Sequence, residues 1–158
     1  MNVRIEGEKI VLRSVDSSDI DTILLWENSS AEPLYGVYEE TFSREDVVQF
    51  IENQQRFSLA ENEQLRLMIC SHEGERLGAL DLAEYDGEKA FISILIFDLD
   101  NRRKGFAENA LQLVASYAKS LGLHALYANI FPENFPSISL FKKVGFVKEK
   151  GNCFLRLL

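Results

Sequence analysis

The sequence predicts a single α/β (α+β) domain over residues 1–158, with one mixed, mostly antiparallel sheet of about seven strands and about four helices. Three observations support this class. Short apolar runs with strand character alternate with segments whose apolar residues recur at helical spacing. Three of these strands follow one another in mid-chain with only turns between them, which indicates an antiparallel meander. No repeat or linker-like stretch divides the chain, so the predicted order is β-α-α-β-β-β-α-β-α-β-β.

The N-terminal third supplies one strand and two helices. Residues 9–15 (KIVLRSV) are typical of a strand. Asp16 and Asp19 have the spacing of a capping box, in which each side chain accepts from the other residue's backbone N–H, and they predict a first helix. Ser43 and Asp46 repeat this pattern before the run VVQFIENQQRF and predict a second helix.

The three central strands are expected over residues 64–71, 76–85 and 90–97, joined by the turns HEGE and DGEK. The third run, AFISILIF, is almost entirely apolar, which is typical of a central strand buried on both faces. We therefore expect this strand to lie in the middle of the sheet.

The C-terminal half predicts a long helix after Gly105, closed by Gly122 as a C-cap, then a strand over 123–130 and a short helix over 137–144. Two strands over 146–158 complete the chain, and the Gly-Asn dipeptide between them is a two-residue hairpin signal.

Composition narrows the classes of partner. A hydrophobic share of 46% and a net charge of −8 indicate a soluble, acidic globular protein, so we expect no nucleic-acid partner and a preference for cationic substrates. No apolar run approaches the ~20 residues of a membrane helix, and no secretory signal is visible, which predicts a cytoplasmic protein without a membrane partner. Cys70 and Cys153 lack metal-type spacing; buried free thiols are favoured over a disulfide, and no metal is expected.

One short stretch departs from the acidic balance of the chain. Arg102, Arg103 and Lys104 precede Gly105 where a helix is about to begin. A helix N-terminus is already partly positive, so each cation there costs about 0.3–1 kcal/mol unless an anion lies between them. Gly105 and the small Ala107 leave room for backbone N–H groups to approach such an anion. The spacing matches neither a P-loop nor a dinucleotide-binding motif, and taken alone it also fits a solvated loop.

A second pattern follows this stretch at a fixed distance. The residues that carry it are Asn134, Ser137, Phe141, Lys143, Gly145 and Phe146. Together with Arg102-x-x-Gly105-x-Ala107, they resemble the GNAT superfamily of acyl-CoA-dependent N-acetyltransferases, whose signatures are [RQ]-x-x-G-x-[GA] and N-x-x-S-x-x-x-[YF]-x-[KR]-x-G-F. The opening LRSVDSSDI and a helix ending in WEN look most like the branch of polyamine (diamine) and ribosomal-protein N-terminal acetyltransferases.

The resemblance implies acetyl-CoA as co-substrate and an anion that is the pyrophosphate of coenzyme A. Backbone N–H groups from about Arg103 to Ala107 would bind it, with Arg102 and Lys104 adding charge. The pantetheine arm would insert between two splayed strands and bond the backbone of the central one. The residues implied along the cofactor are Leu95, Ile96, Phe97, Arg102, Arg103, Lys104, Gly105, Phe106, Ala107, Asn134, Phe141 and Lys143. For Asn134 a helix cap is an alternative role, and for Lys143 a plain surface position.

The chemistry implied is direct attack of a primary amine on the thioester. The amine must first lose a proton, since an alkylammonium has a pKa near ~10. Many relatives carry a tyrosine at the position of Phe141 that protonates the leaving thiolate, which phenylalanine does not do. Tyr127 and Tyr85 are the substitutes we consider. A carboxylate that the family often has falls at Ile92 here, so the nearest acids are Asp81 and Glu84 on the preceding strand.

Alternation along that strand places Asp81 on one face with Ala79 and Ala83. This mid-strand carboxylate has two interpretations: it binds the cationic acceptor or acts as a general base, or it forms an ion pair with a nearby arginine.

The acceptor implied by the resemblance is a small polyamine or diamine, or a protein N-terminus. The segment 29–42 is predicted to be irregular and offers residues that suit an amine and that a solvated loop would explain as well: Glu32, Tyr35, Tyr38, Glu39 and Glu40. The final hairpin is short, which favours an open cleft. Relatives often form homodimers, although nothing in the sequence locates an interface. The alternative function is a non-catalytic acyl-CoA-binding or sensing domain. Phenylalanine in place of tyrosine at position 141 and the absence of a carboxylate at position 92 are consistent with it.

Overall fold

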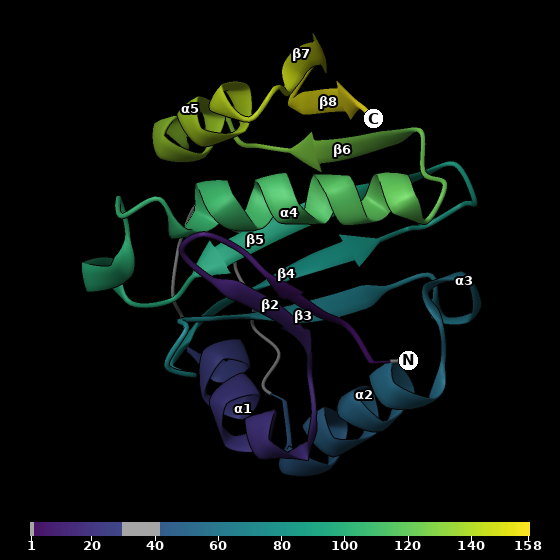
Figure 1. The fold of residues 1–158 in the computed structure, drawn as a ribbon, viewed down its shortest axis with the longest axis vertical. Helices are drawn as coiled ribbons and strands as arrows, with labels where there is room; N and C mark the ends of the chain where they lie inside the picture. The colour runs from purple at the N-terminus through teal and green to yellow at the C-terminus, as the bar shows by residue number, and fades with distance from the viewer. Residues whose placement is uncertain (1, 30–41) are drawn as a thin grey trace.

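The computed structural model describes residues 2–29 and 42–158, and its framework is one sheet of eight strands in the order β1-β2-β3-β4-β5-β6-β8-β7. Every neighbouring pair is antiparallel except β5 and β6, which are parallel. The strands are β1 Arg4–Glu6, β2 Val11–Ser14, β3 Leu65–Cys70, β4 Arg76–Ala83, β5 Lys89–Ile96, β6 Ala125–Asn129, β7 Val147–Lys150 and β8 Cys153–Leu157. The predicted class, a mixed and mostly antiparallel α/β fold, is confirmed (Figure 1).

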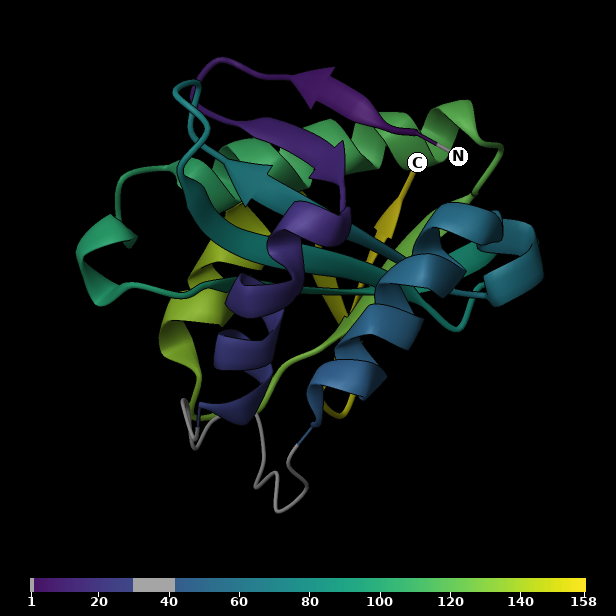
Figure 2. The ribbon, with the colours of Figure 1, turned by 90° about the horizontal axis from the view of Figure 1, so that it is seen from below.

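Helices cover both faces of this sheet. The α-helices are α1 Ile20–Asn28, α2 Arg44–Arg56, α3 Leu59–Asn62, α4 Phe106–Ser120 and α5 Phe135–Lys143, and short 3-10 helices occupy η1 Ser17–Asp19 and η3 Leu99–Asn101. Helices α1 and α2 lie on one side of the sheet and α4 on the other (Figure 2). Helix α4 covers the face that carries Leu65, Leu67 and Ile69 of β3, whereas α1 and α2 pack on Met68 and Cys70.

Both predicted capping boxes are present. The Asp16 carboxylate accepts from the Ser18 N–H at 2.8 Å, and Asp19 accepts from the Asp16 N–H at 2.9 Å. Ser43 and Asp46 are paired in the same reciprocal way at the start of α2. These local bonds satisfy N–H groups that a helix start leaves unpaired, which is why the two starts could be predicted from sequence.

Two short elements were not predicted, and they raise the count above the expected seven strands and four helices. Strand β1 has charged residues on both sides of Ile5, so its sequence shows little of the apolar pattern of a strand. Helix α3 is one turn long, too short for a helical period, although Ser58 and Glu61 form a capping box that signals its start.

The expectation that the third central strand is buried on both faces is wrong. In β5, Ala90, Ile92 and Ile96 are buried beneath the α4 side, but Ser93 on the opposite face is exposed and Phe91 beside it is only half-buried. The reason is that, within the described residues, the apolar cluster of α1 and α2 includes Met68 and Cys70 of β3 but no side chain of β5. The apolar residues on the uncovered side of β5 are therefore available to line a site.

We call this uncovered area the open face. It consists of side chains from β5 and β6 that alternation and the register between Phe91 and Tyr127 place on the same side as Asp81. Its members are Phe91, Ser93, Leu95, Tyr127 and Asn129. All five are half-buried or exposed, which leaves this part of the sheet accessible.

Candidate functional site

The strands β5 and β6 separate in the middle of the sheet. They pair only from Lys89 with Ala125 to Phe91 with Tyr127, yet β5 continues to Ile96 and β6 to Asn129. Beyond the last pair, each strand edge that faces the other has no strand partner among residues 2–29 and 42–158. This wedge-shaped gap, which we call the splay, opens toward the start of α4 (Figure 1).

Backbone groups of β5 point into the splay at every second residue. The Phe97 N–H donates to the Leu77 carbonyl at 3.0 Å, so the backbone of Phe97 faces β4, and by the antiparallel alternation that of Leu95 does too. The groups of Ile94 and Ile96 face the opposite way, into the splay. The predicted set of Leu95, Ile96 and Phe97 is therefore corrected: only Ile96 presents its backbone to the splay, and Ile94 joins it.

The β4 and β5 backbones approach each other closely beside this gap. A Cβ atom added at Gly78 would lie 2.0 Å from the Leu95 carbonyl oxygen and 3.0 Å from the Ile96 Cα. These are backbone atoms, which do not move aside as a flexible side chain does. Only glycine at position 78 therefore allows β5 to follow its observed path beside β4.

The predicted anion cradle lies where the splay opens. Gly105 is the N-cap residue of α4 with φ +85°, a left-handed conformation that favours glycine, and no side chain caps the helix. The first N–H groups of α4, from Phe106 and Ala107 onward, are therefore not satisfied by a capping side chain. Arg103 also adopts a positive φ of 61°, which shapes the turn before the helix. This arrangement fits a bound phosphate.

The three cations of the cradle differ in what they do. The half-buried Arg102 donates from Nε to the Ile96 carbonyl at 2.9 Å and so ties the cradle to the end of β5. Arg103 and Lys104 are exposed, and within residues 2–29 and 42–158 neither forms an ion pair with a carboxylate. Two side chains are thus available to an anion, and the third holds the loop in place.

The three downstream residues that the resemblance places along the cofactor each have a partner within the protein. Asn134 is 5% exposed and caps α5 by accepting from the Ser137 N–H at 3.3 Å, so the alternative role as a cap is realised. Lys143, which is exposed, pairs with Glu108 of α4 at 3.1 Å. Phe141 is buried, and its ring meets that of Phe146 edge-on at 4.9 Å between centroids. Their contacts with the cofactor stay predictions.

On the same side of the sheet as the open face, Asp81 forms an ion pair with an arginine, which was the second of its two interpretations. Arg66, opposite it on β3, donates from two nitrogens to its two carboxylate oxygens, each at 2.8 Å. Arg66 also donates to Glu27 of α1 at 2.6 Å, and its guanidinium lies 4.8 Å above the centre of the Phe50 ring. We call Arg66, Glu27 and Asp81 the Arg66 cluster; its formal charge is −1, from one cation and two anions.

The Arg66 guanidinium is charged in spite of its environment. Burial opposes the charged form, but hydrogen bonds and Coulomb attraction from Asp81 and Glu27 outweigh it and raise the pKa of Arg66 above its ordinary value. Arg66 is also held by its backbone, since its N–H donates to the buried Gln54 side chain at 2.8 Å. The two carboxylates are more accessible: Asp81 is 19% exposed and Glu27 is 32% exposed.

The WEN sequence at the end of α1 supplies contacts that the sequence did not assign. Trp26 stacks on Phe97 at 5.4 Å between ring centroids, and Glu27 belongs to the Arg66 cluster. Asn28 exchanges two hydrogen bonds with the backbone of Phe42, at 2.7 and 2.9 Å. Three successive residues at one helix end thus make three different contacts. Helical amphipathicity did not reveal them, because their partners are distant in the sequence: Phe97 just after β5, Arg66 on β3, and Phe42.

The other two predicted catalytic residues lie at the closed end of the splay. Tyr127 packs against Phe91 at 5.6 Å between centroids, with the Lys89 ammonium 5.1 Å above its ring. Glu84 is exposed, follows the last residue of β4 and has φ 51°. Neither is joined to Asp81 by a hydrogen bond or an ion pair within the described residues. The predicted acceptor residues Glu32, Tyr35, Tyr38, Glu39 and Glu40 lie outside the described residues.

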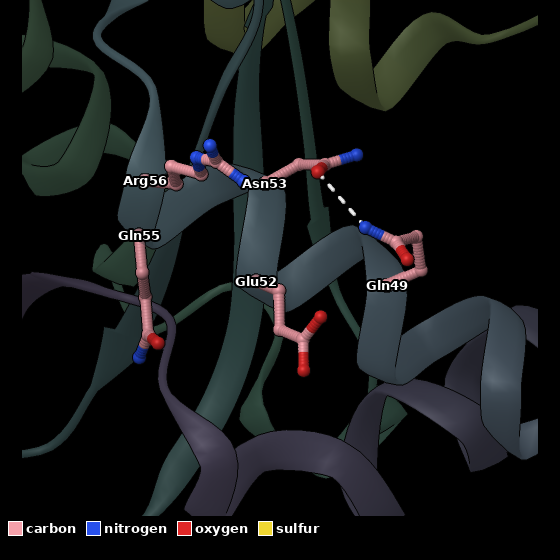
Figure 3. Close-up of a pocket in the computed structure, with 5 residues that line it drawn as sticks. All are labelled: Gln49, Glu52, Asn53, Gln55 and Arg56. Atoms are coloured by element: carbon pink, nitrogen blue, oxygen red, sulfur yellow. Dashed lines mark hydrogen bonds between the residues drawn. The ribbon is translucent and has the colours of Figure 1, made fainter.

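Other features of the molecule point to no competing site. A hollow of about 380 Å³ on α2 is lined by Gln49, Glu52, Asn53, Gln55 and Arg56 of that single helix, with one hydrogen bond between Gln49 and Asn53 (Figure 3). Within the described ranges, no group of His, Cys, Asp and Glu residues is placed to hold a metal ion, and no helix is long and apolar enough to cross a membrane. Cys70 and Cys153 are free thiols, as predicted, but only Cys70 is buried; Cys153 is half-buried.

Comparison with known proteins adds to this geometry. The family model described as "Acetyltransferase (GNAT) domain" matches residues 9–147. An uncharacterized N-acetyltransferase of Bacillus subtilis (strain 168), YnaD, is 25% identical over 148 residues, which are 93% of this chain and 84% of that protein.

Two solved structures share the fold. Spermidine N-acetyltransferase from Vibrio cholerae, in complex with CoA and spermine, superimposes with a TM-score of 0.78 at 20% identity, covering 94% of this chain and 95% of that one. RimJ of Mycobacterium smegmatis, in complex with CoA-disulfide, gives 0.79 at 17% identity, covering 98% and 86%.

Proposed function

This chain belongs to the acetyltransferase (GNAT) domain family, and we propose that it moves the acetyl group of acetyl-CoA to a primary amine of a polyamine, a diamine or a protein N-terminus. Membership makes it an acyl-CoA-dependent N-acetyltransferase with acetyl-CoA as co-substrate, as the sequence predicted. The observation that carries the proposal is the splay of β5 and β6, which ends at an uncapped, cation-flanked helix start.

The residues of this chain suit two parts of coenzyme A, the pyrophosphate and the pantetheine arm. The N–H groups at the start of α4, with Arg103 and Lys104, would hold the pyrophosphate, and Gly105 gives this helix start its left-handed N-cap conformation. The pantetheine arm would lie in the splay, where Ile94 and Ile96 present backbone groups. When bound, the cofactor supplies an activated thioester; the chain supplies position and polar groups.

The acceptor amine is proposed to bind at the Arg66 cluster. Its excess negative charge adjoins the open face, because Ser93 of β5 is the direct cross-strand neighbour of Asp81. Asp81 has both oxygens engaged by Arg66, so it suits the role of an ion-pair partner for an ammonium better than that of a proton acceptor. Glu27 uses Oε1 for Arg66 and is the more exposed carboxylate, which makes it the better candidate to take the proton.

The deciding experiment is calorimetric titration with acetyl-CoA of the wild type and of Gly105→Glu. A glutamate there would strain the left-handed N-cap and place a carboxylate where the phosphate binds, so we expect affinity to fall by about 100-fold or more. Gly74→Glu is the matched control, since Gly74 also has a positive φ, 93°, but has open space around it and lies in the β3–β4 turn.

A panel of amines then distinguishes the acceptors. Thiol release with spermidine or a diamine but not with peptides supports a polyamine substrate, and the reverse supports a protein N-terminus. Binding without thiol release from any amine would contradict acetyl transfer and favour a sensing domain. Absence of binding by the folded wild type would overturn the cofactor site itself.

A further inference from the structure

The turn between β1 and β2 is packed against the first turns of α4, about 100 residues away in the sequence. The Lys9 N–H donates to the Asn109 Oδ1 at 2.8 Å. A Cβ atom added at Gly7 would lie 2.5 Å from the Leu113 Cδ1 and 2.7 Å from the Asn109 Oδ1. Glycine at this position therefore allows the turn to lie directly on the helix, and the backbone bond of Lys9 fixes it there.

This docking brings the Lys9 ammonium to the anion cradle. Its Nζ donates to the Lys104 carbonyl at 3.0 Å and lies 2.6 Å from the position that a Cβ atom at Gly105 would occupy. Lys9 is thus a cation at the N-cap of α4 that comes from a different part of the chain than Arg103 and Lys104. The sequence motif at residues 102–107 does not include Lys9, which lies 95 residues before Lys104.

The charges at this point are unbalanced. In the part of the chain that the structure describes, no carboxylate forms an ion pair with Lys9, Arg103 or Lys104. Three cations therefore gather at the positive end of a helix, where each of them is unfavourable. A phosphate between them would reverse the sign of every one of these interactions.

We propose that Lys9 is a phosphate-binding residue of the cofactor site, whose ammonium pairs with the pyrophosphate of coenzyme A held at the start of α4. The inference rests on the proposed function. The helix N–H groups and Lys9 belong to separate elements, and the pyrophosphate would contact both of them. Asn109 serves as the positioning residue that anchors the Lys9 backbone.

The test compares the dissociation constants of CoA and of dephospho-CoA, which lacks only the 3′-phosphate, by calorimetry. Lys9→Gln removes the ammonium but keeps the backbone N–H that bonds Asn109, so the turn stays docked. We expect Lys9→Gln to weaken both ligands by about tenfold, the loss of one charge-assisted contact, and Lys9→Arg to restore most of the affinity. Lys148→Gln removes an exposed cation from β7 and is expected to leave both constants unchanged.

Each other outcome overturns a defined part of the proposal. Unchanged affinity of Lys9→Gln for both ligands, with a wild type that binds them, removes Lys9 from the site and leaves the proposed function intact. Weaker binding of CoA alone would assign Lys9 to the 3′-phosphate and overturn the pyrophosphate assignment. Failure of the wild type to bind either ligand would overturn the proposed function together with this inference. A thermal midpoint equal to that of Lys148→Gln checks that the variant is folded.

Discussion

Two charged regions lie beside β5, and they are built in opposite ways. The cradle at the start of α4 consists of consecutive residues and presents backbone N–H groups, and two of its cations, Arg103 and Lys104, have no carboxylate partner in the described residues. The Arg66 cluster draws Glu27, Arg66 and Asp81 from α1, β3 and β4, and its charges already neutralise one another except for one.

The difference follows from what each region is proposed to bind. A phosphate is a compact, fully ionised anion, so backbone donors and unpaired cations suffice to hold it. An amine must be attracted as a cation and then react without its proton, which requires an environment whose negative charge is small. A single excess charge in the Arg66 cluster is consistent with this second requirement.

The largest expected effect comes from Gly78, where the backbones of β4 and β5 approach each other closely. Gly78→Ala would place a Cβ atom 2.0 Å from the Leu95 carbonyl oxygen, so β4 and β5 must move apart. We expect a loss of roughly 3 kcal/mol or more in the free energy of unfolding, measured by urea denaturation, together with weaker binding of acetyl-CoA.

Gly74→Ala is the control for this variant. It introduces strain at φ 93° with no atom within 4 Å, and is expected to cost about 1 kcal/mol. Equal losses in the two variants would mean that the sheet relaxes around residue 78, and the close approach of the strands would no longer explain the path of β5.

Much of the cradle could be predicted from the sequence because its parts are neighbours in the chain. The positions of Arg103, Lys104 and Gly105 follow from one short stretch and from the physics of a helix start. Lys9 could not be predicted, since nothing local indicates that the β1–β2 turn lies on α4. The backbone assignment at Leu95 was wrong for a related reason: the direction of each peptide group depends on the register with β4.

The acceptor side was harder to predict because it depends on register between strands. Alternation along β4 correctly grouped Asp81 with Ala79 and Ala83, and an arginine partner was one of two interpretations. The sequence did not show that this arginine is Arg66 or that Glu27 also binds it. Both facts depend on how β3, β4 and α1 are placed relative to one another. The prediction that the third central strand is buried on both faces was wrong for the same reason. Periodicity does not show how far two helices extend over a sheet face.

A medium effect is expected from Asp81→Asn, which tests the acceptor side alone. The substitution keeps the shape but changes the formal charge of the Arg66 cluster from −1 to 0. We expect the KM for a cationic amine to rise by about tenfold while the dissociation constant of acetyl-CoA stays the same.

The control for this change is Asp21→Asn, which removes a carboxylate whose side chain is 85% exposed and paired with Arg44. That variant is expected to behave as the wild type. If Asp81→Asn leaves both the KM for the amine and the turnover unchanged, Asp81 serves only to hold Arg66, and the acceptor site lies elsewhere.

The smallest effect, and the sharpest comparison, is the response of the two regions to salt. Raising the ionic strength from 0.1 to 1 M shortens the Debye length from about 10 to about 3 Å, which screens exposed charges far more than buried ones. Calorimetry should show CoA binding weakened by about fivefold, because Arg103, Lys104 and Lys9 are exposed. The stability difference between wild type and Asp81→Asn should change by less than about 0.3 kcal/mol, since the Arg66 side chain is only 16% exposed and is bonded on several sides. Equal sensitivity of the two quantities would contradict the distinction drawn between them: the Arg66 cluster would then be as open to solvent as the cradle, and its charge would be too well screened to attract an amine.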